Sequence, residues 1–463
     1  QNSVVIWTRV TPQYQVSEVT VKWEVSADVN FNKIIQSGTT TTSPKRDYTV
    51  KEIVSSLKPN TIYYYRFSAF NVTSMTGKTK TLPTDDSQVK LAVASCSNIE
   101  FGYFNAYAAM SDENVNAVIH LGDYIYEYGP DVYGDKSFSR KNIPPHEIIT
   151  LQDYRDRYSQ YRLDPDLIKA HASVPFINVW DDHEITNNAY IDGAQNHQDD
   201  EGSYDNRKNI AKQVFYEWLP IRETEHHYRK FRFGNAMELF MLDERLAGRT
   251  AQADSITDPR RFSNEQKLLG DQQMEWLIDN LKSSTTSWKV LGNQVIFSYS
   301  DWGYEGFSQN MDAWDGYPND QKRLTEAIQK NNIDNLIFVT GDTHTAWAFE
   351  ATSDPFETYN PKTSEGAIGV EFGVTSITSG NSNERHPTDV VKKHEMKIAN
   401  SDVNPHLKYV NMRDHGYLIL TLDSDKVEAD FKIVTTLKER DTSVKSDKKF
   451  VVKKGSTKLI GKL

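Results

Sequence analysis

Side chains able to bind a metal ion follow five short apolar runs in this sequence. Each run is rich in Val, Ile, Leu or Ala and stops abruptly, as a buried strand does before a turn. The candidates at or just past these ends are Cys96, Asp123 with Tyr126, Asp182 with His183, Asn293, and Asp342 with His344. A single Asp after a strand is usually a cap or turn residue, but in open α/β sheets ligands bind beyond the carboxyl ends of the strands. Five such ends therefore predict a shared metal centre.

The predicted ligands are chemically mixed. The thiolate of Cys96 and the phenolate of Tyr126 suit a trivalent, strongly polarising ion such as Fe³⁺. Carboxylates and the carbonyl oxygen of Asn293 suit Ca²⁺ or another hard divalent ion. Asp123 stands at the centre of the set and could bridge two ions.

Two further side chains have alternative interpretations. His183 directly follows Asp182 and could donate a proton to the leaving oxygen of a substrate, or it could be a structural histidine that supports a ligand. Arg245, three residues after a predicted strand, could hold a phosphate or form a surface ion pair. The acidic run at 199–201 is either an extra calcium site or a solvated loop.

These residues require a fold that brings strand ends together. From residue 89 onward predicted strands alternate with helices, which indicates a layered α/β domain. We predict strands at 89–94, 115–121, 174–180, 237–242, 288–291, 335–339 and within 366–379, helices at 103–110, 152–161, 204–218 and 270–281, and a hairpin at 417–434.

The first part of the chain has a different pattern. Short β-branched or aromatic runs at 4–7, 19–25, 48–54 and 61–70 are separated by turn signals. The segment L-K-P-N-T-I-Y-Y-Y-R-F at 57–67 resembles a strand region of a fibronectin type III-like sandwich. We therefore predict a small all-β domain at 1–82, a catalytic domain at 89–435, and a Lys-rich basic tail of unknown role at 436–463.

Composition excludes some classes of protein. The net charge of −11 argues against a general nucleic-acid binder. No apolar run is long enough to cross a bilayer, and the single cysteine excludes an intramolecular disulfide. The chain begins at Gln1 without a charged and apolar leader. We expect a mature, secreted or periplasmic form whose signal has been removed.

Several ordered motifs resemble those of the PhoD-type alkaline phosphatases. They are A-S-C-S (94–97), L-G-D-Y-I-Y-E (121–127), W-D-D-H-E (180–184), G-N-Q (292–294), W-D-G-Y-P (314–318) and G-D-T-H (341–344). The opening V-V-I-W-T-R-V-T-P (4–12) and the segment at 234–245 resemble that family too. The resemblance extends over residues 1–435.

This resemblance implies a fold, an activity and two cofactors. The family is a branch of the metallophosphoesterases, in which a double β-sheet sandwich flanked by helices follows a small β-domain. Its members use Fe³⁺ and Ca²⁺ to hydrolyse phosphate monoesters or diesters, as in phosphate scavenging. By resemblance, the iron ligands are Cys96, Asp123, Tyr126 and His344, and the calcium ligands are Asp123, Asp182, Asn293 and Asp342. His183 is then the catalytic acid.

Two other functions are alternatives to this one. A catalytically dead, calcium-dependent binding or adhesion protein could retain the same scaffold, but a degenerate site usually loses a ligand. A thiol hydrolase could use Cys96 as its nucleophile, although the spacing shows no base paired with it. Release of nitrophenol from its phosphate esters would separate the first alternative from an active phosphoesterase.

Overall fold

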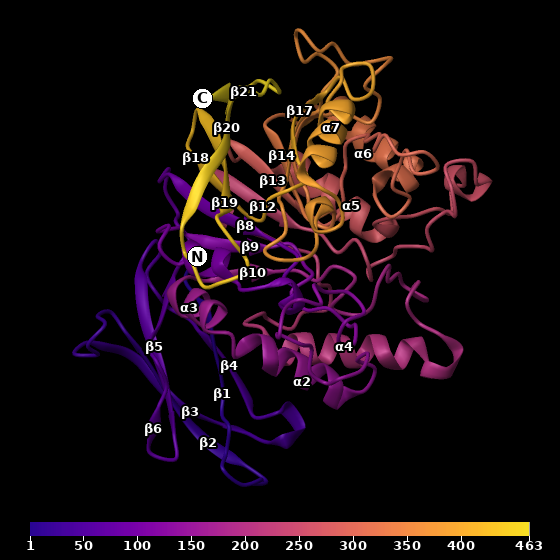
Figure 1. Cartoon of the computed structure of the whole chain (residues 1–463). Coiled ribbons are helices and arrows are strands. Elements are labelled where there is room, and N and C mark those ends of the chain that lie inside the picture. Colours follow the sequence, from indigo (N-terminus) through magenta and orange to yellow (C-terminus); the bar gives the residue numbers. More distant parts are fainter. Residues whose placement is uncertain (463) are drawn as a thin grey trace.

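Two seven-stranded β-sheets face each other at the centre of the structure, a computed structural model that describes residues 1–462 (Figure 1). The first has the strand order β10-β9-β8-β18-β19-β20-β21 and the second β11-β12-β13-β14-β16-β15-β17. The first sheet consists of β8 (Val89–Ala94), β9 (Ala117–His120), β10 (Phe176–Asn178), β18 (Gly416–Leu422), β19 (Lys426–Val434), β20 (Val444–Lys453) and β21 (Ile460–Lys462). The second consists of β11 (Arg229–Phe233), β12 (Met237–Met241), β13 (Trp288–Asn293), β14 (Leu336–Thr340), β15 (Ala346–Ala351), β16 (Gly369–Gly373) and β17 (Leu407–Asn411). The predicted α/β double-sheet sandwich is confirmed.

The facing surfaces of the sheets form one apolar core. Alternate residues of a strand point to the same face, and Leu91 and Val93 of β8 meet Leu239 and Met241 of β12 in this core. All four side chains are fully buried. Burying each such side chain contributes about 1.5–3 kcal/mol to the free energy of folding.

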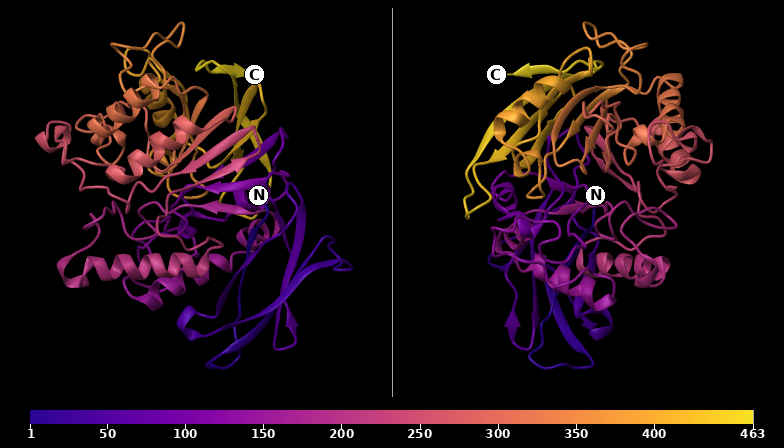
Figure 2. Two further views of the ribbon diagram at one scale, coloured as in Figure 1. Left: turned by 180° about the vertical axis from the view of Figure 1, so that it is seen from behind. Right: turned by 45° about the vertical axis from the view of Figure 1, so that its right-hand side comes forward.

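Helices cover the outer faces of both sheets (Figure 2). Those against the first sheet are α1 (Asn105–Met110), α2 (Leu151–Arg162), α3 (Pro165–Ser173) and α4 (Tyr204–Trp218), and those against the second are α5 (Gly270–Ser283), α6 (Pro318–Lys330) and α7 (Thr388–Ile398). Short 3-10 helices are η1 (Pro44–Arg46), η2 (Ile99–Phe101), η3 (Asp199–Glu201), η4 (Pro259–Phe262), η5 (Trp314–Gly316) and η6 (Ser382–Glu384). Within residues 1–462, no helix has the length and apolar character needed to span a membrane.

Helix α4 was predicted correctly because its cap and its apolar spacing are local signals in the sequence. Ser203 precedes it, and its hydroxyl accepts a hydrogen bond from the Asn206 amide at 3.4 Å, which caps the first turn. Ala211, Val214, Phe215 and Trp218 recur at helical spacing and are all buried. The helix occupies the predicted residues 204–218, whereas α3, α6 and α7, together with β11, β15 and β17, were not predicted.

The first 80 residues form a separate pair of small sheets. β1 (Val4–Arg9) pairs with β4 (Thr49–Val54), and the other sheet contains β3 (Ile34–Thr42), β2 (Val19–Ser26), β5 (Ile62–Ala69), β6 (Val72–Thr73) and β7 (Gly77–Lys80). They enclose their own apolar cluster. Arg155 of α2 donates to the carbonyl oxygens of Pro44 and Lys45 at 3.3 and 2.8 Å, which ties these sheets to the helical layer.

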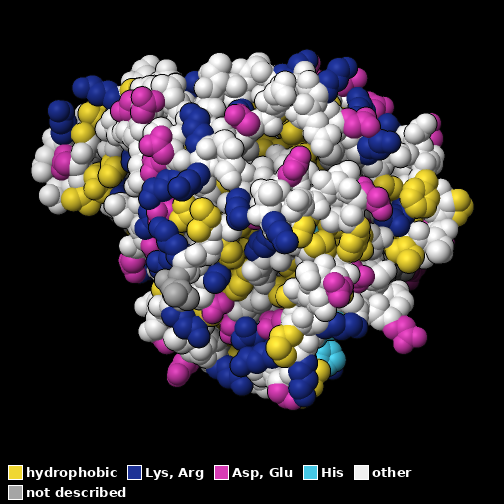
Figure 3. Space-filling model, turned by 90° about the horizontal axis from the view of Figure 1, so that it is seen from above, with side chains coloured by type: hydrophobic (Ala, Val, Ile, Leu, Met, Phe, Trp, Pro, Cys, Tyr) yellow, Lys and Arg dark blue, Asp and Glu magenta, His cyan; other side chains and the backbone are white. Residues whose placement is uncertain are grey.

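The Lys-rich segment beyond residue 436 is not a free tail. β20 pairs with β19 along its length, and β21 pairs with β20, so the segment extends the first sheet at its edge. Phe450 and Val452 point into the core between the sheets, while Lys445, Lys449 and Lys453 remain exposed. Figure 3 shows the face that lies at the top of Figure 1, and Lys and Arg side chains are spread over much of it. The apolar run Phe450-Val451-Val452 is therefore the buried part of β20.

Candidate metal centre

The ends of five strands place the predicted ligands at one edge of the sandwich. β8, β9 and β10 run parallel in the first sheet, and β13 and β14 run parallel in the second. Three groups of side chains could each hold a metal ion, because the potential ligand atoms within each group lie within 4.8 Å of one another. They are Cys96 with Asp123 and His344, Asp123 with Asp182 and His183, and Asp181 with Asp182 and Asp342. Asp123 belongs to two groups and Asp182 to two, so the groups are continuous.

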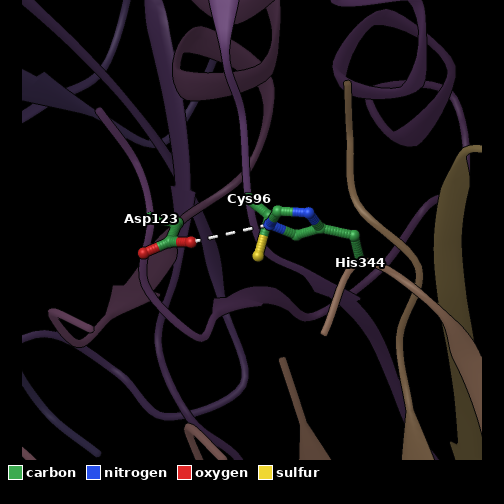
Figure 4. A group of neighbouring side chains, drawn as sticks. All are labelled: Cys96, Asp123 and His344. Atoms are coloured by element: carbon green, nitrogen blue, oxygen red, sulfur yellow. Dashed lines mark ion pairs between the residues drawn. The ribbon is translucent and has the colours of Figure 1, made fainter. Parts of the chain in front are cut away.

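Cys96, Asp123 and His344 form the first group (Figure 4). The Nε2 atom of His344 lies 3.9 Å from Oδ2 of Asp123, while its Nδ1 lies 2.9 Å from the carbonyl oxygen of Gly380. Because that carbonyl can only accept, Nδ1 carries the proton and the lone pair of Nε2 faces the group. The hydroxyl of Tyr126 donates to Asp123 at 2.8 Å and lies 3.1 Å from His344 Nε2. Four predicted ligands thus meet here.

The backbone at these positions is strained. Non-glycine residues rarely adopt positive φ angles, and where they do the strain often accompanies function. Left-handed φ values occur at Cys96 (61°), Asp123 (54°), Asp342 (63°) and His344 (60°). The surrounding structure therefore holds these four residues in a conformation that places their side chains within the potential metal-binding groups.

Two buried glutamates hold the turns in place. Glu184 accepts hydrogen bonds from the backbone amides of Asp123 at 3.0 Å and Tyr124 at 2.6 Å. On the opposite sheet, Glu244 accepts from the amides of Gln294 at 2.7 Å and Val295 at 2.8 Å. Each carboxylate satisfies backbone donors that a sharp turn would otherwise leave unpaired.

The electrostatics of the centre fit bound cations. Oδ1 of Asp123, Oδ1 of Asp182 and Oδ2 of Asp181 are buried and find no hydrogen-bond donor within residues 1–462. Burial raises the pKa of Asp342 to about 7 and that of Asp181 to about 8. Clustered carboxylates of this kind need protons or metal ions to offset their mutual repulsion. Hard oxygen atoms without donors are the ligands that such ions require.

The other ligand types respond to burial in the expected directions. Burial, followed by the charge of Asp123, raises the pKa of the Cys96 thiol and of the Tyr126 phenol well above their ordinary values. A bound cation reverses this effect, because it stabilises the deprotonated ligand. Burial lowers the pKa of His344 to about 4, which keeps the imidazole neutral and able to bind a metal ion.

His183 lies beside the carboxylates but has its own partner. Its Nδ1 atom is 2.7 Å from Oε2 of Glu127. Burial alone would lower its pKa, but the charges of Asp182, Glu127 and Asp123 raise it well above the ordinary value. Its ring packs against Tyr126, with centroids 4.2 Å apart. A protonated imidazole held next to metal ligands is able to act as an acid.

Arg245 is neither a surface ion pair nor free to clamp a phosphate. Its side chain is fully buried, and its guanidinium contacts Asp181 at 2.5 Å, Asp312 at 2.8 Å and Asp342 at 3.2 Å. It is therefore a counter-ion that offsets part of the negative charge of the centre.

Asn293 and the acidic run at 199–201 differ in their relation to the centre. The side-chain oxygen of Asn293 accepts from Trp314 Nε1 at 3.0 Å, and an amide oxygen has a second lone pair for a cation. Its role as a ligand remains a prediction.

The run at 199–201 forms η3, in which Glu201 pairs with Arg207 at 3.1 Å. Among the described residues, this run belongs to none of the potential metal-binding groups.

Sequence reasoning overlooked three acids of the centre. Asp181 precedes Asp182, and the doubled acid after an apolar strand was a usable signal. Glu127 closes the L-G-D-Y-I-Y-E motif, but nothing local indicates its partner. Asp312 lies in a loop without any pattern, and only the fold brings it to Arg245.

Comparison with known proteins identifies relatives along the whole chain. Residues 91–431 match the family model described as PhoD-like phosphatase, and residues 1–83 match its N-terminal domain. Alkaline phosphatase D of Bacillus subtilis (strain 168) is 37% identical over 99% of this chain and 80% of that relative. A solved structure of PhoD superposes with a TM-score of 0.89 at 34% identity, covering 99% of this chain and 89% of that one. A purple acid phosphatase from yellow lupin seeds shares the fold, with a TM-score of 0.61 at 14% identity over 98% of this chain and 72% of its own.

Proposed function

This chain belongs to the PhoD-like phosphatase family, and on that premise we propose that its centre uses Fe³⁺ and Ca²⁺ to hydrolyse phosphate monoesters or diesters. It is a metal-dependent phosphoesterase, and its substrates are phosphate esters. The convergence of a thiol, a phenol, an imidazole and a shared carboxylate at one edge of the sandwich carries the proposal. No observation on this chain favours a catalytically dead scaffold.

The two ions would divide the ligands between them. Cys96, Asp123, Tyr126 and His344 would hold Fe³⁺, since thiolate and phenolate donors favour a polarising ion. Asp123, Asp182, Asn293 and Asp342 would hold Ca²⁺, because all four offer hard oxygen atoms. When bound, such ions activate water and neutralise the charge that develops on the phosphoryl group.

The protein itself supplies the proton and a counter-charge for the carboxylates. His183 donates a proton to the leaving oxygen, since its second ring nitrogen is not engaged by Glu127. Arg245 offsets part of the negative charge of Asp181 and Asp342 and fixes the direction of their carboxylates. We also propose that the protein acts outside the cytoplasm, because calcium is abundant enough there to fill a site of modest affinity. Detection of the protein in the extracellular or periplasmic fraction of its cells would test this proposal.

Calcium dependence tests the proposed divalent ion. Dialysis against EGTA is expected to lower kcat about a hundredfold or more, because losing one ion removes several kcal/mol of transition-state stabilisation. Added Ca²⁺ should restore the rate, and elemental analysis should show calcium returning with it. Full activity of calcium-free protein that contains only zinc would contradict the assignment.

The iron ligands should give the protein a visible colour. Charge transfer from thiolate or phenolate to Fe³⁺ absorbs visible light, and among the proposed ligands only Cys96 and Tyr126 provide such donors. Tyr126→Phe is therefore expected to bleach or shift the band while some iron remains, since only one oxygen atom is removed. Cys96→Ser should shift the band again. A colourless, fully active wild-type protein without iron would exclude Fe³⁺.

A further inference from the structure

A buried carboxylate lies directly behind the proposed catalytic histidine. Glu127 is fully buried, four residues after Asp123. Its Oε2 atom lies 2.7 Å from Nδ1 of His183. Its Oε1 atom accepts from the amide of Asn187 at 2.8 Å, from Asn196 Nδ2 at 2.9 Å and from Thr186 Oγ1 at 3.2 Å. The carboxylate therefore meets four donors, and among the described residues it belongs to none of the potential metal-binding groups.

The backbone that carries Glu127 is held as firmly as its side chain. Arg157 of α2 is fully buried and donates to the carbonyl oxygens of Tyr126 and of Tyr128, the neighbours of Glu127 on either side. The amide of Ile148 donates to the carbonyl oxygen of Glu127 itself at 3.0 Å. Movement of this carboxylate would break contacts with several separate segments, so its position is set by the fold.

Asn196 connects this carboxylate to helix α4. Its Nδ2 atom also lies 3.1 Å from Oε1 of Glu147, and its backbone carbonyl oxygen accepts a hydrogen bond from Arg207 at 3.1 Å. Arg207 is buried in α4 and pairs with Glu147 at 2.7 Å. Asn196, which donates to Glu127, is thus itself held in place by Glu147 and Arg207.

We infer that Glu127 is a positioning residue that fixes the ring direction and the tautomer of His183 in phosphoester hydrolysis. This inference rests on the proposed role of His183 as proton donor. Because Nδ1 donates to Glu127, Nε2 is the nitrogen that faces away from it and toward the metal ligands. A histidine without this partner could rotate or present its other nitrogen, and its proton would miss the leaving oxygen.

Glu127→Gln tests the inference sharply. An amide offers one acceptor and one donor, whereas the site presents donors on both sides. If the side-chain oxygen of the variant faces His183, its NH₂ group faces the donors from Asn187, Asn196 and Thr186. If the side-chain amide is flipped, its NH₂ group faces Nδ1 of His183, which is also a donor. The variant keeps the shape of the side chain but cannot satisfy this arrangement.

The readout is the dependence of the rate on the leaving group. Proton donation matters for an ethyl ester of phosphate, whose leaving oxygen is strongly basic, and little for a 2,4-dinitrophenyl ester. Glu127→Gln is expected to lower kcat about 10–100-fold on the ethyl ester, the usual cost of losing such a support. On the dinitrophenyl ester the expected loss is less than about threefold, because that leaving group needs no proton. Ethyl and dinitrophenyl esters of phenyl phosphate replace these probes if diesters are the better substrates.

Glu217→Gln is the matched control. Glu217 is also a buried glutamate, but it pairs with Arg155 at 2.8 Å at the end of α4. This variant is expected to lower Tm without altering the dependence on the leaving group. Metal content is measured for each variant by elemental analysis, so that loss of an ion is recognised.

Combination with His183→Ala separates the possible outcomes. In that background Glu127→Gln should change kcat less than about twofold, because the two residues act as a unit. Equal losses on both esters that persist in the His183→Ala background would overturn the inference and leave Glu127 a structural residue. If His183→Ala itself leaves the leaving-group dependence unchanged, the proposed acid fails, and the inference fails with it. Should Glu127→Gln not fold, Asn196→Ala removes one donor to the same carboxylate and must reproduce the leaving-group pattern at smaller size.

Discussion

Asp123→Asn is expected to reduce kcat by at least about 10⁴-fold, because losing several kcal/mol of stabilisation from each of two ions amounts to about 6 kcal/mol. Asp123 contributes ligand atoms to both the group with Cys96 and His344 and the group with Asp182. It is also fully buried, and one of its oxygens has no donor among residues 1–462. An amide in its place offers a weaker, neutral ligand that cannot bridge two cations.

The measurement combines steady-state rates with elemental analysis of the purified variant. Loss of activity should accompany loss of iron, of calcium or of both. Asp200→Asn, the same change in the exposed loop of η3, serves as the control and should keep wild-type rates. Thermal unfolding gives a second readout, since ions that bind only the folded protein stabilise it. Wild-type activity of Asp123→Asn with a full metal complement would show that this carboxylate bridges nothing.

His183→Ala is expected to lower kcat about 10²–10⁴-fold on esters with a basic leaving oxygen, the usual contribution of a general acid. The imidazole lies beside Asp182 and Asp123, whose charges favour its protonated form. Both ions should remain bound, because His183 is not among the predicted ligands. The rate on a dinitrophenyl ester should fall much less.

The control for this variant is His386→Ala, which removes an exposed imidazole outside the centre. Rates on an ethyl and a dinitrophenyl ester, together with metal content, decide the result. An unchanged rate of His183→Ala on the ethyl ester would make His183 a structural residue that supports Asp182.

Local signals determined which strands carry ligands. An apolar strand that ends in Gly-Asp, as at 122–123 and 341–342, or in Asp-Asp-His, as at 181–183, is encoded within a few neighbouring residues. The same holds for α4, whose buried stripe lies within its own fifteen residues and whose cap, Ser203, directly precedes them. Because parallel strands end at one edge of a sheet, these signals were enough to predict a shared centre.

The tertiary structure alone decided which charges meet. Arg245 reaches Asp312 across 67 residues of sequence, and His183 reaches Glu127 across 56. β20 shows the same limit, because its lysines are typical of a solvated segment, and only its pairing with β19 makes it a strand. Hydrophobic periodicity records which face of an element is buried, but not which other element buries it. Partners of buried charges therefore emerge only when both sheets and the helices around them are packed together.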